Sequence, residues 1–65
     1  MRIRLNGDYV EVTSTTLDKV LVETGYEDAV VATALNGEFV PADNRRDVTV
    51  SPGDDIEVLA PMQGG

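Results

Sequence analysis

The 65-residue sequence contains no cysteine and no histidine. Without cysteine, the chain has no disulfide, no thiolate ligand for zinc or iron–sulfur clusters, and no thiol nucleophile. Without histidine, it lacks the side chain that most often serves as a general base or a metal ligand near neutral pH. We therefore expect the chain itself to hold no metal, no bound cofactor and no catalytic residue.

Basic residues are also scarce. Five Lys and Arg stand against twelve Asp and Glu, for a net charge of −7. This balance argues against binding to nucleic acid or to an anionic membrane, because both require a basic surface. It suits a basic protein partner. The sequence shows neither an apolar leader nor an apolar run long enough to span a membrane, so we expect a cytoplasmic protein.

The first half of the sequence predicts a hairpin followed by a helix. Over the first thirteen residues, apolar and polar side chains alternate on both sides of Asn6-Gly7, a pair that favours a tight hairpin turn. A helix is expected near residues 16–24, with N-cap hydroxyls from Ser14-Thr15-Thr16 and an end at Gly25 in the left-handed conformation.

The second half reads as further strands. A β-branched and small apolar run covers 30–35, and Asn36-Gly37 then predicts a second hairpin. Pro41 stops the return strand because proline has no N–H to donate. A polar connection over 42–47 precedes an alternating segment over 48–50, and a last strand is expected over 56–59.

This order of elements, ββαβ(β)β, predicts an α+β fold of the β-grasp, or ubiquitin-like, type. We expect a mixed four- to five-stranded sheet packed on one main helix. Residues 1–65 would form a single domain with a flexible tail over 61–65. The residues expected to be mostly buried are Ile3, Leu5, Val10, Val12, Leu17, Val20, Leu21, Val40, Ile56 and Val58.

The sequence closes on Gly64-Gly65. Two glycines at a chain end serve no local structural purpose, since glycine increases the entropy of an already loose terminus. They make chemical sense where the terminal carboxylate must pass through a narrow enzyme channel and react there. The alternative is a frayed tail without function.

Three segments together resemble the bacterial sulfur carriers of thiamine biosynthesis, the ThiS family. They are Ala34-Leu35-Asn36-Gly37-Glu38-Phe39-Val40-Pro41, Gly53-Asp54-Asp55-Ile56-Glu57-Val58 and Leu59-Ala60-Pro61-Met62-Gln63-Gly64-Gly65. The resemblance covers the whole chain. Arg45 and Arg46 lie in a connection where family members vary, and the sequence gives them no role.

The resemblance implies a protein co-substrate rather than an enzyme. A ThiF-type adenylyltransferase would use ATP and Mg²⁺ to convert the Gly65 carboxylate into an acyl-adenylate. Sulfur from a cysteine desulfurase persulfide would displace AMP and leave a thiocarboxylate. A ThiG-type thiazole synthase would then take that sulfur into the thiazole ring.

The same resemblance assigns roles to residues near the end of the chain. Gly65 would be modified, while Gly64 and Gln63 would occupy the channel of the partner. Met62 and Leu59 are expected to help dock the partner, because strand alternation places Leu59 off the core face. Phe39 is a further docking candidate, although the sequence alone leaves it open between core and surface.

Other functions share parts of this pattern. A molybdopterin-type sulfur carrier has the same fold and also ends in two glycines. A ubiquitin-like modifier would form isopeptide bonds through Gly65, and Lys19 as the one lysine makes branched polymers of this chain unfavourable. A plain β-grasp binding module would tolerate any terminus.

Overall fold

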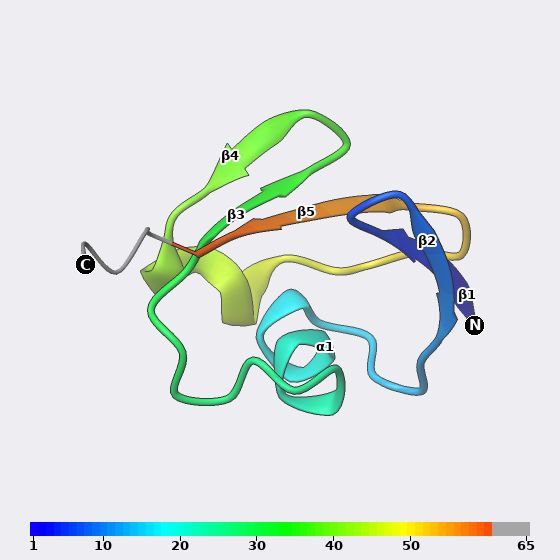
Figure 1. The fold of residues 1–65 in the computed structure, drawn as a ribbon, viewed down its shortest axis with the longest axis horizontal. Helices are drawn as coiled ribbons and strands as arrows, with labels where there is room; N and C mark the ends of the chain where they lie inside the picture. Colours follow the sequence, from blue (N-terminus) through cyan, green and yellow to red (C-terminus); the bar gives the residue numbers. More distant parts are fainter. Residues whose placement is uncertain (61–65) are drawn as a thin grey trace.

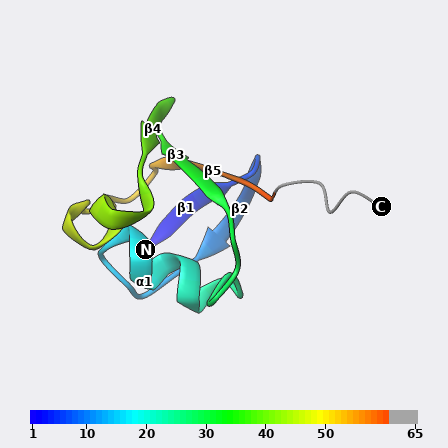
Figure 2. The same ribbon diagram turned by 90° about the vertical axis from the view of Figure 1, so that its left-hand side faces the viewer.

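A computed structural model describes residues 1–60 as a curved five-stranded sheet that wraps over one α-helix (Figures 1 and 2). The elements in chain order are β1 (Arg2–Leu5), β2 (Asp8–Glu11), α1 (Leu17–Glu23), β3 (Ala32–Leu35), β4 (Glu38–Val40), the 3₁₀ helix η1 (Ala42–Asp47) and β5 (Asp55–Leu59). None of the helices in this part of the chain is long and apolar enough to cross a membrane.

The strands are arranged in the order β2-β1-β5-β3-β4. β5, the last strand in the sequence, lies in the centre, where it runs parallel to β1 and antiparallel to β3. The two hairpins β1–β2 and β3–β4 form the two sides of the sheet. This mixed sheet packed on one helix confirms the predicted β-grasp fold.

Both Asn-Gly pairs form tight turns with positive φ at the two central residues. Asn6 and Gly7 have φ of 51° and 88°, and Asn36 and Gly37 have φ of 50° and 86°. Asparagine and glycine tolerate this region of backbone space better than other residues, and such turns match the twist of the flanking strands. The two hairpin predictions are therefore confirmed.

The start of α1 differs from the prediction. Thr16 is the N-cap residue, but its hydroxyl makes no capping hydrogen bond and is buried with no hydrogen-bond partner among residues 1–60. The backbone supplies a partner instead, since the Leu17 N–H donates to the Val48 carbonyl at 3.0 Å. The expected capping by the hydroxyls of Ser14-Thr15-Thr16 is thus wrong, since the N-cap hydroxyl makes no bond to the first turn of α1.

The end of α1 agrees with the prediction. Gly25 has φ of 98°. The Gly25 N–H donates to Val22 at 3.2 Å, and the Tyr26 N–H donates to Leu21 at 2.8 Å. This pair of bonds is a Schellman motif, which satisfies carbonyls left free in the last helical turn.

Glu23, the last residue of α1, fastens the helix to the connection before it. Its carboxylate accepts the Thr13 N–H at 2.9 Å and the Ser14 N–H at 3.0 Å. These backbone donors favour the ionised form and lower the pKa of Glu23. They also offset the unfavourable position of a negative charge at a helix C-terminus.

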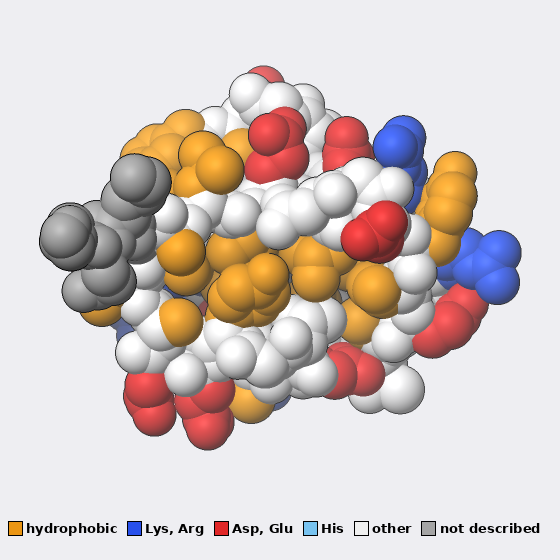
Figure 3. Space-filling view, in the orientation of Figure 1, with side chains coloured by type: hydrophobic (Ala, Val, Ile, Leu, Met, Phe, Trp, Pro, Cys, Tyr) orange, Lys and Arg blue, Asp and Glu red, His pale blue; other side chains and the backbone are white. Residues whose placement is uncertain are grey.

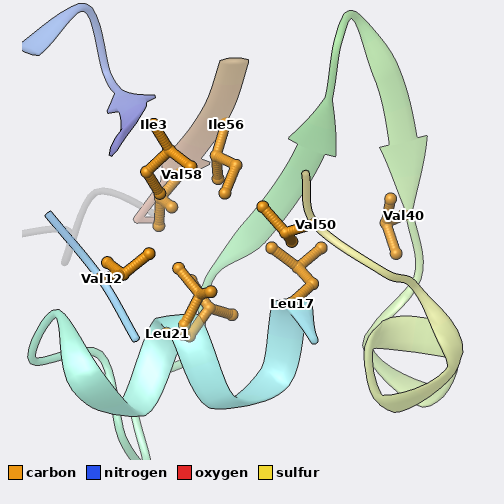
Figure 4. Packing of buried hydrophobic residues seen from close by; sticks show 9 residues of the cluster. Ile3, Val12, Leu17, Leu21, Val40, Val50, Ile56 and Val58 are labelled. Carbon is orange, nitrogen blue, oxygen red and sulfur yellow. The ribbon is translucent and has the colours of Figure 1, made fainter. Parts of the chain in front are cut away.

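The hydrophobic core lies between the sheet and α1, where side chains from the strands point toward the helix (Figure 4). Its buried members are Ile3, Val12, Leu17, Val20, Leu21, Val40, Val50, Ile56 and Val58. Leu5 and Val10 are only partly buried, contrary to the prediction. They belong to the β1–β2 hairpin at the side of the sheet. Val50 and the polar Thr33 are buried although the sequence did not predict it.

Three segments between the elements also depart from the prediction. The strand expected over 30–35 begins at Ala32, and Val30 before it is largely exposed. The polar connection over 42–47 forms η1. The alternating segment 48–50 makes a single bridge between Thr16 and Thr49 rather than a strand, because its backbone pairs with the residues that lead into α1.

Candidate functional site

Four apolar side chains share the face of the sheet that points away from α1. Cross-strand pairing places Ala32 opposite Leu59 and Ala34 opposite Phe39. Directly paired residues, and residues two apart in one strand, point to the same face. Leu59 and Phe39 are each 68% exposed. We call Ala32, Ala34, Phe39 and Leu59 the apolar patch.

The surface is hollowed on two sides of Leu59. One open depression of about 380 Å³ is lined by Val30, Val31, Ala32, Leu59 and Ala60. A smaller one of about 80 Å³ lies between Leu59 and Phe39 and is lined by the strands beneath them. Figure 3 shows a group of hydrophobic side chains near β4, and a larger row of them between the sheet and α1. The shape is therefore suited to receive apolar side chains from a protein surface.

Charge is distributed unevenly over the outer face. Glu57 pairs with Ala34 and brings a carboxylate to the border of the apolar patch. The arginines of this face lie on β1, where Arg2 pairs with Glu11 at 3.1 Å and the Arg4 guanidinium lies 5.6 Å from the centre of the Tyr9 ring. A partner that covers the apolar patch therefore meets acidic rather than basic neighbours.

Arg45 supports one wall of this surface. Its side chain donates to the Val31 carbonyl at 2.6 Å and to the Thr33 hydroxyl at 3.0 Å. The Thr33 hydroxyl in turn donates to the Val40 carbonyl at 2.9 Å. Arg45 thus ties η1 to the start of β3, a role that the sequence did not reveal. Its neighbour Arg46 is exposed, and no hydrogen bond or ion pair within residues 1–60 gives it a structural role.

The structure places two of the residues predicted to form the site. Leu59 lies off the core face, as alternation along the strand predicts, and Phe39 belongs to the outer surface rather than to the core. Their role in docking stays a prediction. Met62, Gln63, Gly64 and Gly65 lie outside the described residues. Within the described range 1–60, no cluster of acidic side chains could hold a metal ion.

Comparison with known proteins gives the family. The model of the ThiS family matches residues 3–65 of the chain. A crystal structure of the thiamine biosynthesis protein ThiS from Geobacter metallireducens is similar over 100% of both chains, with a TM-score of 0.78 and 27% sequence identity. No curated protein sequence matches the chain. Because the family match covers nearly the whole sequence, the chain belongs to the ThiS family, the small sulfur carriers to which its sequence resemblance pointed.

Proposed function

We propose that this protein carries sulfur for thiazole formation in thiamine biosynthesis as a thiocarboxylate at Gly65. The observation that carries the proposal is the family match, which runs through Gly64-Gly65 to residue 65. The fold supports it further, because the apolar patch lies at the end of β5 that leads into this segment.

The first chemical step is adenylation by an ATP-dependent, ThiF-type enzyme. A carboxylate is a poor electrophile, so an oxygen of Gly65 attacks the α-phosphorus of ATP and pyrophosphate leaves. ATP and Mg²⁺ belong to the activating partner, and the carrier contributes only the carboxylate and the chain that delivers it. Glycine has no Cβ, so Gly64 allows other backbone or a nucleotide to approach closely.

The second step replaces oxygen with sulfur. A sulfur nucleophile attacks the acyl carbon, and AMP leaves with the electron pair of the broken bond. Sulfide gives the thiocarboxylate directly. A persulfide from a cysteine desulfurase gives an acyl disulfide, which a thiol must then cleave by reduction. The thiocarboxylate passes its sulfur to a ThiG-type thiazole synthase.

In this proposal, the activating enzyme docks on the apolar patch. Leu59 and Phe39 offer exposed apolar area beside two depressions, and aromatic and aliphatic side chains of this kind form the buried centre of protein interfaces. Glu57 at the border favours a partner with basic residues around an apolar centre. The net charge of −7 accelerates encounter with such a partner.

The test is incubation of the protein with ATP, Mg²⁺, a ThiF-type enzyme and sulfide, followed by intact mass spectrometry. Exchange of one oxygen for one sulfur at Gly65 is expected. Adducts to lysines of other proteins would instead indicate a ubiquitin-like modifier. No change would refute the proposal, provided that intact mass first verifies a free carboxylate on Gly65.

A further inference from the structure

The backbone of β5 loses its neighbour on one side before the strand ends. In an antiparallel pair, alternate residues direct their N–H and C=O groups to opposite sides of the strand. On the β1 side, Ile56 is still bonded to the main chain, since the Asn6 N–H donates to its carbonyl at 2.9 Å. β1 ends at Leu5, so no strand within residues 1–60 lies beside Val58, the next residue that faces this side.

The side chain of Asn6 takes the place of that missing strand. Its Oδ1 accepts the Val58 N–H at 2.8 Å, and its Nδ2 donates to the Val58 carbonyl at 3.2 Å. A side-chain amide offers one acceptor and a donor in the same plane, as a peptide group does. Asn6 therefore continues the pairing of β5 by one residue, across 52 positions of sequence.

This contact lies one residue before the end of β5, from which the chain continues toward Gly65. Leu59 follows Val58 and belongs to the apolar patch, and among residues 1–60 its strand partner is Ala32 of β3. The amide of Asn6 thus fixes the course of β5 at the point where the chain leaves the sheet. The hydrogen bonds are partly buried, so water competes with them less than it would at a fully exposed position.

We propose that Asn6 is a positioning residue for activation of the carrier. By pairing with both backbone groups of Val58, its side chain holds the end of β5 and Leu59 in the orientation that the activating enzyme recognises. The inference rests on the proposed function, because it concerns delivery of the segment that carries Gly65.

Asn36 provides a matched control at the opposite end of the same strand. It has nearly the same φ as Asn6 and is also followed by a glycine with positive φ. Its Oδ1 accepts the Asp55 N–H at 2.9 Å, and its own N–H donates to the Asp55 carbonyl at 2.7 Å. Asn36 therefore supports the start of β5, whereas Asn6 supports its end.

The experiment compares Asn6→Gly with Asn36→Gly. Glycine retains the positive φ of each turn and removes only the side chain. We expect both variants to lower the denaturation midpoint by similar amounts. In ATP–pyrophosphate exchange with a ThiF-type enzyme, Asn6→Gly should lose at least about fivefold in kcat/KM relative to Asn36→Gly, the factor that one net hydrogen bond supports.

Hydrogen exchange separates positioning from general destabilisation. Asn6→Gly should remove protection of the Val58 amide and leave that of Asp55, while Asn36→Gly should do the reverse. In Asn6→Asp, the protonated acid has the donor and acceptor of the amide, whereas the ionised form places an oxygen against the Val58 carbonyl. The ionised carboxylate can still accept the Val58 N–H but repels the Val58 carbonyl, so the stability of Asn6→Asp relative to Asn6→Gly should rise as the pH falls through the pKa of the introduced aspartate.

The outcomes are distinct. A wild-type protein that is not activated at all would refute the proposed function. An active wild type together with equal kcat/KM for the two glycine variants would overturn the role of Asn6 alone. If Asn6→Gly does not fold, Asn6→Asp at neutral pH takes its place in the same comparison, and activity equal to that of Asn36→Gly would again overturn the inference.

Discussion

Truncation of Leu59 to alanine tests whether the apolar patch docks the activating enzyme. Complete burial of a leucine side chain stabilises a complex by about 1.5–3 kcal/mol relative to an exposed one. Leu59 is 68% exposed in the free protein, so about two-thirds of that value, about 1–2 kcal/mol, is available on binding. Leu59→Ala should therefore raise Kd for the activating enzyme about 5- to 30-fold.

The assay is titration calorimetry of wild type and variant with the activating enzyme, together with thermal unfolding of each carrier. Val22→Ala is the control, because Val22 is an apolar side chain that is 51% exposed but lies on α1, beneath the opposite face of the sheet (Figure 2). Val22→Ala should leave Kd unchanged. Both variants should unfold close to wild type, since neither side chain is in the core. Equal Kd for all three proteins would show that the enzyme docks elsewhere.

Three further predictions concern the core, one carboxylate and the reactive end. Leu21→Ala removes a side chain buried between α1 and the sheet and should cost about 2–5 kcal/mol of unfolding free energy in urea titrations; an unchanged midpoint would contradict the core assignment. Because the pKa of Glu23 is lowered in the folded protein, its ionised carboxylate stabilises the fold fully at pH values above 4.5, the ordinary pKa of a glutamate. This contribution is lost as the pH falls through the folded-state pKa. Glu23→Gln should therefore be less stable than wild type at pH 7, with a difference that shrinks toward acid pH; a constant difference would show that the carboxylate charge does not matter. Gly64→Val should leave thermal unfolding unchanged and severely slow ATP–pyrophosphate exchange, because a β-branched residue restricts the backbone and fills a narrow channel; normal exchange would remove Gly64 from the delivery path.

The elements that could be predicted from the sequence are those fixed by local rules. Asn6-Gly7 and Asn36-Gly37 impose their turns through positive φ, and Gly25 ends α1 in the same way. The exposed position of Leu59 follows from strict alternation along a strand whose core face is marked by Ile56 and Val58. Such features depend on residues that are close in the sequence, so the sequence alone predicts them.

The features that were missed depend on contacts between distant segments. The sequence around Thr16 does not reveal that the Leu17 N–H, at the start of α1, donates to the Val48 carbonyl from another part of the chain. In the sequence, Arg45 is one of two arginines in a polar connection. Its role depends on the fold, which places the Val31 carbonyl and the Thr33 hydroxyl beside its side chain. Asn6 shows a turn signal in the sequence, but its second role requires β5 to lie next to β1.

The central claim is that the carboxylate of Gly65 is activated and exchanged for a thiocarboxylate. Intact mass spectrometry after incubation with ATP, Mg²⁺, the activating enzyme and sulfide measures this directly. The account predicts replacement of one oxygen by one sulfur, located at Gly65 by fragmentation and dependent on ATP. An unchanged mass for a carrier that has a free Gly65 carboxylate and binds the enzyme would contradict the claim.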